Sequence, residues 1–202
     1  VYHSAIDLVN DAIDLVSAYA KGEQPTQSYE KLAFHFYAYH VLLPGTYSLV
    51  LNLLAGGLSS CFRELRFMTE MIAKCYLADR DYADLSSFRD KLRGLEGDGE
   101  QAHKPVTPIM QKFDKALRSD TQATDLWKAL SEESHARKYV GRVVKNVFER
   151  DNVPGYALVL PMPYTTDDLP DLLELKRYID QFSEILRRTT RNKLEDGHAC
   201  EN

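Results

Sequence analysis

Apolar side chains recur every three or four residues along most of the chain, a spacing that is typical of amphipathic helices. The clearest example is residues 2–20, where aspartates occupy the opposite side. Its predicted core-facing side chains are Ile6, Val9, Ile13, Val16 and Ala20. A second helix, rich in aromatic residues, is expected over 29–43. We expect it to end at Pro44-Gly45, because proline cannot continue the hydrogen-bond ladder of a helix.

Helix is expected to resume near Thr46 and to reach about Asp79, with either a break or a close contact between helices at Gly56-Gly57. Its longest part is the helix over residues 58–79. Its main apolar face, projected at about 100° per residue, consists of Leu58, Phe62, Leu65, Thr69, Ile72 and Tyr76. Further cysteine and methionine side chains widen this face to most of the circumference. A helix of this kind is usually surrounded by other helices, so we expect 58–79 to be the centre of the fold.

The remaining pattern predicts several shorter helices and few extended residues. The helices are expected at 82–95, 106–118, 121–135 and from about 166 onward. The segment 137–150 suits a strand or a helix, whereas 153–163 contains three prolines and is expected to be extended. Residues 192–202 are expected to be a loose tail. The prediction is therefore an all-α bundle of six to eight helices in one domain, 1–202, with a short extended segment near 153–163.

Composition narrows the class of protein. The 202 residues carry a formal net charge of −5, which argues against a surface that binds nucleic acid everywhere but leaves room for a local basic patch. The three cysteines are odd in number and widely spaced, which suits a reducing compartment, and we expect a cytoplasmic protein. Residues 41–58 are uncharged, yet their proline and three glycines favour a buried helix over a membrane span.

A narrow charged stripe interrupts the apolar surface of the 58–79 helix. It consists of Arg63, Arg66, Glu70 and Lys74. One interpretation is a solvated edge in which Arg66 and Glu70 form an i,i+4 pair. The other is a preformed cationic cleft that holds an anion such as phosphate.

The helix expected at 121–135 ends in a cluster of polar residues. Ser131, Glu132 and His135 follow the packed face around Trp127. His135 could act as a general acid or base, or could simply close the last turn of the helix. The candidate ligand- or anion-binding residues are therefore Arg63, Arg66, Glu70, Ser131, Glu132 and His135. Of these, Arg66 and His135 are the candidate catalytic residues.

No metal site or cofactor is expected. The Glu-x-x-His pairs at 100–103 and 132–135 do not form a di-iron set, because the first falls in a loop rich in glycine and proline. A local basic patch at Lys138, Arg142 and Lys145 is either a solvated face or a surface for RNA, with aromatic residues nearby for stacking.

Two segments carry a resemblance to a known group. CFRELRFMTEMIAKCYLAD (61–79) and LWKALSEESH (126–135) resemble segments of uncharacterised prokaryotic helical proteins related to the HEPN superfamily. Many members of that superfamily are metal-independent ribonucleases or components of toxin–antitoxin and phage-defence systems. They use an Arg, four to six intervening residues and a His. Arg191-Asn192…His198 fits that formula, within the tail that we expect to be loose, and Arg66 and His135 could instead meet in space.

The resemblance and the stripe lead to two functional hypotheses. The first is an interaction or ligand-sensing module in a stress or defence context, with a protein or RNA partner and a homodimer formed through the apolar final helix. The alternative is a metal-independent ribonuclease, in which His135 or His198 handles the 2′-hydroxyl proton and an arginine stabilises the charged phosphorane.

Overall fold

The computed structural model describes residues 1–21, 30–97, 105–120, 122–134 and 164–199. These residues are mostly helical and contain no strand, so the all-α prediction is confirmed for the part described. The helices are α1 (Tyr2–Ala20), α3 (Ala33–Tyr37), α4 (Leu43–Leu54), α5 (Leu58–Asp81), α6 (Phe88–Glu96), α7 (Val106–Ala116), α8 (Gln122–Glu133) and α10 (Leu169–Ala199). The extended segment expected near 153–163 lies outside the described residues.

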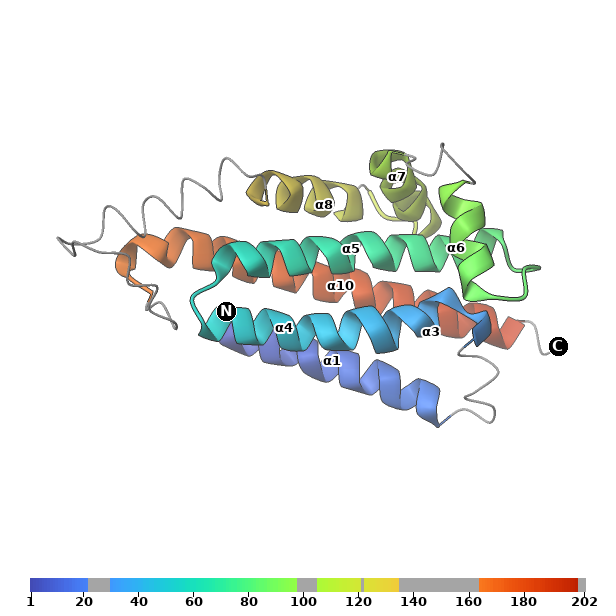
Figure 1. Ribbon diagram of the computed structural model, residues 1–202, viewed down its shortest axis with the longest axis horizontal. Coiled ribbons are helices and arrows are strands. Elements are labelled where there is room, and N and C mark those ends of the chain that lie inside the picture. Colours follow the sequence, from blue (N-terminus) through green and yellow to red (C-terminus); the bar gives the residue numbers. More distant parts are fainter. Residues whose placement is uncertain (22–29, 98–104, 121, 135–163, 200–202) are drawn as a thin grey trace.

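Helix α5 is the centre of the bundle, as its apolar circumference predicts. It contacts α3, α4, α6, α7, α8 and α10. Figure 1 shows α4 and α10 running alongside α5, with α8 and α7 above it and α6 across one end. Helix α1 packs against α4 and α10 on the other side. Because α5 is enclosed on most sides, Arg66, Glu70 and Lys74 of its charged stripe lie in a seam between helices, whereas Arg63 is exposed.

The helix expected over residues 29–43 does not end at Pro44-Gly45, so that prediction was wrong. Helix α3 continues through a π-helical segment, Ala38–Leu42, directly into α4. Proline lacks an N–H and its ring crowds the carbonyl four residues earlier, so a widened turn just before Pro44 lets the helical path continue. Gly45 is buried against Met68, where an added Cβ would lie 2.8 Å from the sulfur, so this glycine allows α4 to approach α5 closely.

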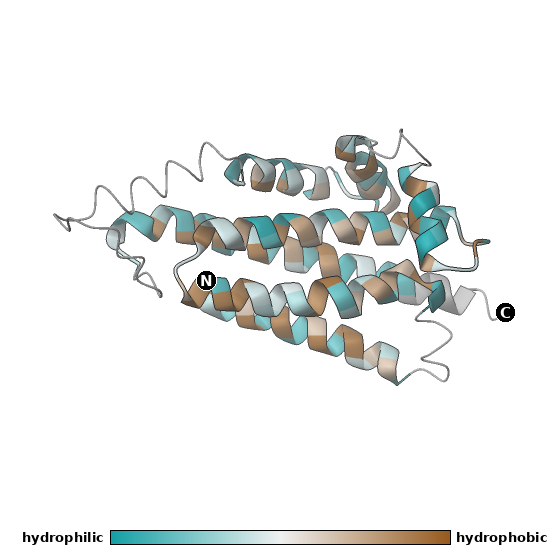
Figure 2. Cartoon of the chain, in the orientation of Figure 1, coloured by the Kyte–Doolittle hydropathy of each residue, from teal (hydrophilic) through white to brown (hydrophobic). Residues whose placement is uncertain are grey.

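Of the two alternatives at Gly56-Gly57, the structure shows the break, because α4 ends at Leu54 and α5 begins at Leu58. Gly56 adopts a φ of 77°, a left-handed conformation that glycine tolerates best, and the Gly57 N–H donates to the Asn52 carbonyl at 2.7 Å. The chain then reverses from α4 into α5 (Figure 1). Helix α4 carries no charged residue, and Figure 2 shows brown, hydrophobic residues along α1 and α4. None of the described helices combines the length and apolarity needed to cross a membrane.

The buried face of α1 differs from the expected one. Ile6 and Ile13 are 49% and 39% exposed, although both were expected to face the core. The side chains that α1 buries are Ala5, Leu8, Val9, Ala12 and Leu15. Apolar side chains therefore cover more of the circumference of α1 than the face that packs against α4 and α10, and some of them remain on the surface.

Helix α10 begins where the sequence predicts and ends later. Thr165 and Asp168 form a reciprocal capping box around a 3₁₀ turn, Thr166–Asp168, that leads into α10. The helix then continues through Ala199, past residue 192, where the sequence led us to expect a loose tail to begin. Its apolar face, proposed for a dimer, lies in the core instead. The buried side chains include Leu175, Ile179, Phe182 and Leu186.

Candidate functional site

The charged seam of α5 contains an ion-pair network that differs from the predicted one. Glu70 pairs with Lys74 at 2.9 Å, and Lys74 also reaches Glu96, the last residue of α6, at 2.8 Å. The expected pair between Arg66 and Glu70 is not among the ion pairs of the described residues. Burial alone would lower the pKa of Lys74, but its hydrogen bonds to Glu96 and Glu70 outweigh burial and raise that pKa. Lys74 is therefore a permanently charged tie between α5 and α6.

Arg66 lies against Trp127 of α8. The guanidinium carbon is 5.7 Å from the centroid of the indole ring, within the range of a cation–π contact. The indole N–H donates to the Glu70 carboxylate at 3.4 Å, so Trp127 contacts both Arg66 and Glu70. The Arg66 Nε atom is buried and has no hydrogen-bond partner among the described residues. A buried donor left in this way is costly, so this position is suited to an additional acceptor.

The other predicted site residues on these two helices do not join this cluster. Arg63 is exposed and donates to Ser60 at 3.0 Å on its own helix. Ser131 is half-buried and donates to the Trp127 carbonyl at 2.7 Å, an ordinary contact within α8, and Glu132 is exposed. The structure therefore brings together Arg66, Glu70 and Trp127 from the candidate region.

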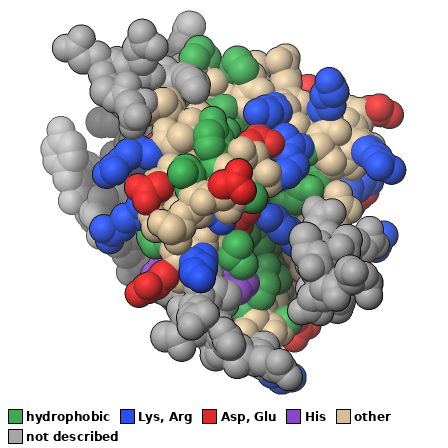
Figure 3. Space-filling model, turned by 90° about the vertical axis from the view of Figure 1, so that its right-hand side faces the viewer, with side chains coloured by type: hydrophobic (Ala, Val, Ile, Leu, Met, Phe, Trp, Pro, Cys, Tyr) green, Lys and Arg blue, Asp and Glu red, His purple; other side chains and the backbone are tan. Residues whose placement is uncertain are grey.

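Four of the predicted residues lie outside the part of the chain that the structure describes. They are His135, Lys138, Arg142 and Lys145. The described residues contain no group of three or more His, Cys, Asp or Glu side chains placed to hold a metal ion. The end of the molecule at α6 and α7 shows basic and acidic side chains intermixed, so the view gives no broad basic field there (Figure 3).

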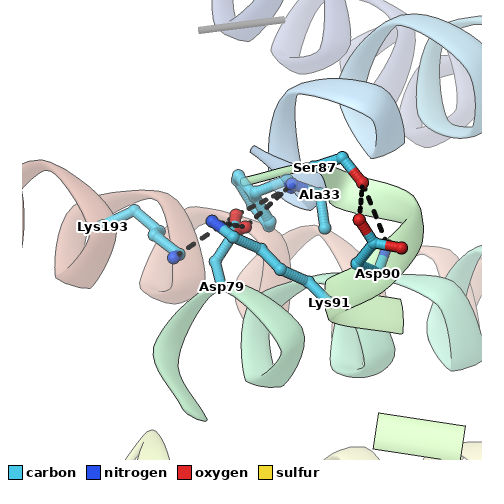
Figure 4. Close-up of polar contacts among 7 residues, drawn as sticks. Ala33, Asp79, Ser87, Asp90, Lys91 and Lys193 are labelled. Carbon is cyan, nitrogen blue, oxygen red and sulfur yellow. Dashed lines mark hydrogen bonds and ion pairs between the residues drawn. The ribbon is translucent and has the colours of Figure 1, made fainter. Parts of the chain in front are cut away.

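Sequence reasoning missed a buried carboxylate at the end of α5. Asp79 is 6% exposed and accepts hydrogen bonds from the backbone N–H groups of Ala33 at 2.8 Å and Phe34 at 2.9 Å (Figure 4). The ammonium groups of Lys91 and Lys193 lie 3.4 Å and 3.6 Å from its oxygens. Asp79 thus caps the N-terminus of α3 and ties α5 to α6 and α10. The only sequence signal was an aspartate closing an otherwise apolar helical turn.

Asp114 of α7 is a second buried carboxylate, and it caps the N-terminus of α8. Its carboxylate accepts the backbone N–H groups of Ala123 and Thr124, both at 2.9 Å, and the hydroxyls of Thr124 at 2.6 Å and Ser119 at 2.7 Å. This long-range cap fixes the start of the helix that carries Trp127. Asp79 and Asp114 have their hydrogen-bonding capacity filled by the fold, which identifies them as structural groups.

Two grooves open along α10, and neither is lined by Arg63, Arg66 or Glu70. One, of about 390 Å³, lies between α8 and α10. The other, of about 420 Å³, lies between α1 and α10. The second includes Arg191, which the sequence singled out, together with Asp14, which it did not.

No family model, curated protein or solved structure gives a significant match to this chain. The case for function therefore depends on the geometry of the described residues.

Proposed function

We propose that the protein is a ligand-sensing module that binds a small anion at the seam between α5 and α8. The observation that carries this proposal is the buried, unpartnered Nε–H of Arg66, held beside the Trp127 ring. Guanidinium groups bind carboxylates and phosphates through paired N–H donors, and a partly dehydrated seam strengthens such contacts.

The charges around Arg66 support an anion at this position. Glu70, one turn further along α5, already accepts from Lys74 and from the indole of Trp127. Each oxygen of Glu70 thus has a donor within the seam, whereas the Nε–H of Arg66 has no acceptor among the described residues. An anion bound to Arg66 would contact α5 directly and α8 through Trp127. Binding would therefore stabilise the docking of α8, which is a means of converting occupancy into a change at the end of that helix.

Trp127 is the only tryptophan in the chain, so its fluorescence reports on the site alone. Titration with inorganic phosphate and with a mononucleotide should change that fluorescence saturably and raise the melting temperature. Arg66→Gln should abolish both effects, whereas Arg63→Gln, an exposed arginine on the same helix, should leave them unchanged. Equal responses in the two variants, or none in the parent protein, would reject the anion site.

A cytoplasmic setting in stress or defence, with a protein or RNA partner, belongs to the same proposal and draws on the resemblance to HEPN-related proteins. We also propose that the protein forms a homodimer. Its support is the uncharged helix α4, on which Tyr47, Leu51 and Leu54 are 49%, 66% and 56% exposed. Sedimentation velocity across a concentration series would reveal self-association, and Leu51→Glu should weaken it.

The alternative, a metal-independent ribonuclease, is favoured by one observation. Helix α10 continues through Ala199, so positions 191 and 198 lie on one continuous helix. Seven residues make about two turns and return to the same side of a helix. A ribonuclease should cleave labelled RNA in EDTA, and His198→Ala or Arg191→Gln should abolish cleavage. If His135 rather than His198 handles the 2′-hydroxyl proton, His135→Ala should abolish cleavage instead. Absence of cleavage by the parent protein would reject this alternative.

A further inference from the structure

The groove between α1 and α10 combines an apolar floor with charged walls. Its lining includes Leu15, Ala18 and Tyr19 from α1 and Leu186 from α10. The Tyr19 ring packs on the imidazole of His35, with ring centroids 3.8 Å apart, so this part of the floor is fixed by the core. A volume of about 420 Å³ lies within the range of small-molecule sites.

The two walls of the groove carry opposite charges. Asp11 and Asp14 lie on the α1 wall, and Arg187 and Arg191 lie on the α10 wall. Asp11 and Arg187 meet across the groove at 2.9 Å. Figure 1 shows α1 and α10 running in the same direction, so steps of three and four residues advance similarly, by about 4.5 and 6 Å.

Asp14 and Arg191 therefore occupy comparable levels about one turn beyond the closed pair. Both are exposed, and neither takes part in an ion pair with any residue that the structure describes. The groove is bridged by protein charges at one level and is open at the next, where an anionic and a cationic group line opposite walls above an apolar floor.

We propose that this groove binds a zwitterionic small molecule with an apolar body, such as an apolar amino acid or a short apolar peptide with free termini. The ammonium group of the ligand pairs with Asp14 and its carboxylate with Arg191, while the apolar body covers Leu15 and Tyr19. A pure anion would face Asp14 unfavourably, and a pure cation would face Arg191. The pairing of charges selects a ligand that carries both.

The probes are L-phenylalanine, phenethylamine and 3-phenylpropionate, which share an aromatic body and differ in their charged groups. Ligand-observed NMR titration at millimolar concentrations should show the tightest binding for L-phenylalanine. Asp14→Asn should weaken L-phenylalanine and phenethylamine by about fivefold and spare 3-phenylpropionate, because each exposed ion pair contributes modestly. Arg191→Gln should weaken L-phenylalanine and 3-phenylpropionate and spare phenethylamine.

Asp7→Asn provides the matched control, because Asp7 is exposed on α1 but does not line the groove. A charge-swapped protein, Asp14→Arg with Arg191→Asp, should recover L-phenylalanine binding, which a merely structural role would not predict. L-phenylalanine binding no tighter than either half-charged probe, or no binding at all, would overturn the proposal. His198→Ala should not affect binding, which separates this site from the ribonuclease hypothesis.

Discussion

Replacing Asp79 by asparagine tests a buried carboxylate that has four partners on three other helices. The carboxylate accepts two backbone N–H groups at the start of α3 and lies beside two ammonium groups. An asparagine side chain keeps one acceptor oxygen and introduces an NH₂ donor. This NH₂ group would face one of the two backbone N–H groups, so that backbone N–H of α3 would lose its acceptor.

The size of the effect follows from burial. Asp79 is 6% exposed and Lys91 is 3% exposed, so Asp79→Asn leaves the Lys91 ammonium buried and without its counter-charge. Removing one member of a buried ion pair typically costs about 3–5 kcal/mol. Proteins of this kind are stable by only about 5–15 kcal/mol, so the loss is a large fraction of the total. With a urea m-value of about 3 kcal/mol/M, the midpoint should fall by about 1 to 2 M.

Urea unfolding followed by circular dichroism at 222 nm measures this shift. Asp180→Asn is the matched control, since Asp180 also pairs with a lysine but at an exposed position, and should cost less than about 1 kcal/mol. Adding Lys91→Met to Asp79→Asn should recover part of the loss, because it removes the uncompensated charge. A midpoint for Asp79→Asn equal to that of the Asp180 control would refute the reasoning.

Three further predictions concern other parts of the fold. Asp114→Asn should cost about 1–3 kcal/mol and shift Trp127 fluorescence to the red, because it weakens the cap of α8 without leaving a buried cation; an unchanged spectrum would contradict this. Burial raises the pKa of Cys61 to about 12 and raises that of Cys75, so at pH 8 neither thiol should react with iodoacetamide until urea is added, as peptide mass mapping would show. The pKa of Asp81 is lowered overall. Burial alone would raise it, but hydrogen bonds from the basic side chains of Arg80 and Lys112 outweigh burial. The stabilisation is therefore present at neutral pH and lost as pH falls below about 4, where Asp81→Asn and the parent protein should converge in unfolding free energy.

The helices could be predicted from the sequence because helical periodicity is a local property. The central position of α5 also followed, since a helix that is apolar on most sides must be enclosed by others. The buried face of α1 could not be derived in this way. Ile6 and Leu8 are equally apolar, and only the shape of the groove between α4 and α10 decides that Leu8 is buried and Ile6 is exposed.

Long-range polar contacts escaped prediction for a related reason. Asp79 caps a helix that begins 46 residues earlier in the chain, and no spacing rule connects the two. In the seam, Glu70 could pair with Arg66 or with Lys74, since both lie four residues away. The position of Trp127 on the neighbouring helix distinguishes them, because its ring contacts Arg66 and its N–H occupies the second oxygen of Glu70.

This contrast separates structural charges from candidate functional ones. The fold supplies the carboxylate of Asp79 with donors from three other elements, and it supplies Asp114 with four hydrogen bonds, so neither has capacity left for a ligand. Arg66 keeps a buried donor that no described residue uses, and Asp14 and Arg191 line one groove without an ion pair to any residue in the described part of the chain. Charges that a fold has already neutralised set its geometry, whereas charges placed beside apolar surface and left unneutralised are available for binding. The two proposed sites are therefore the positions where added solutes should affect this protein.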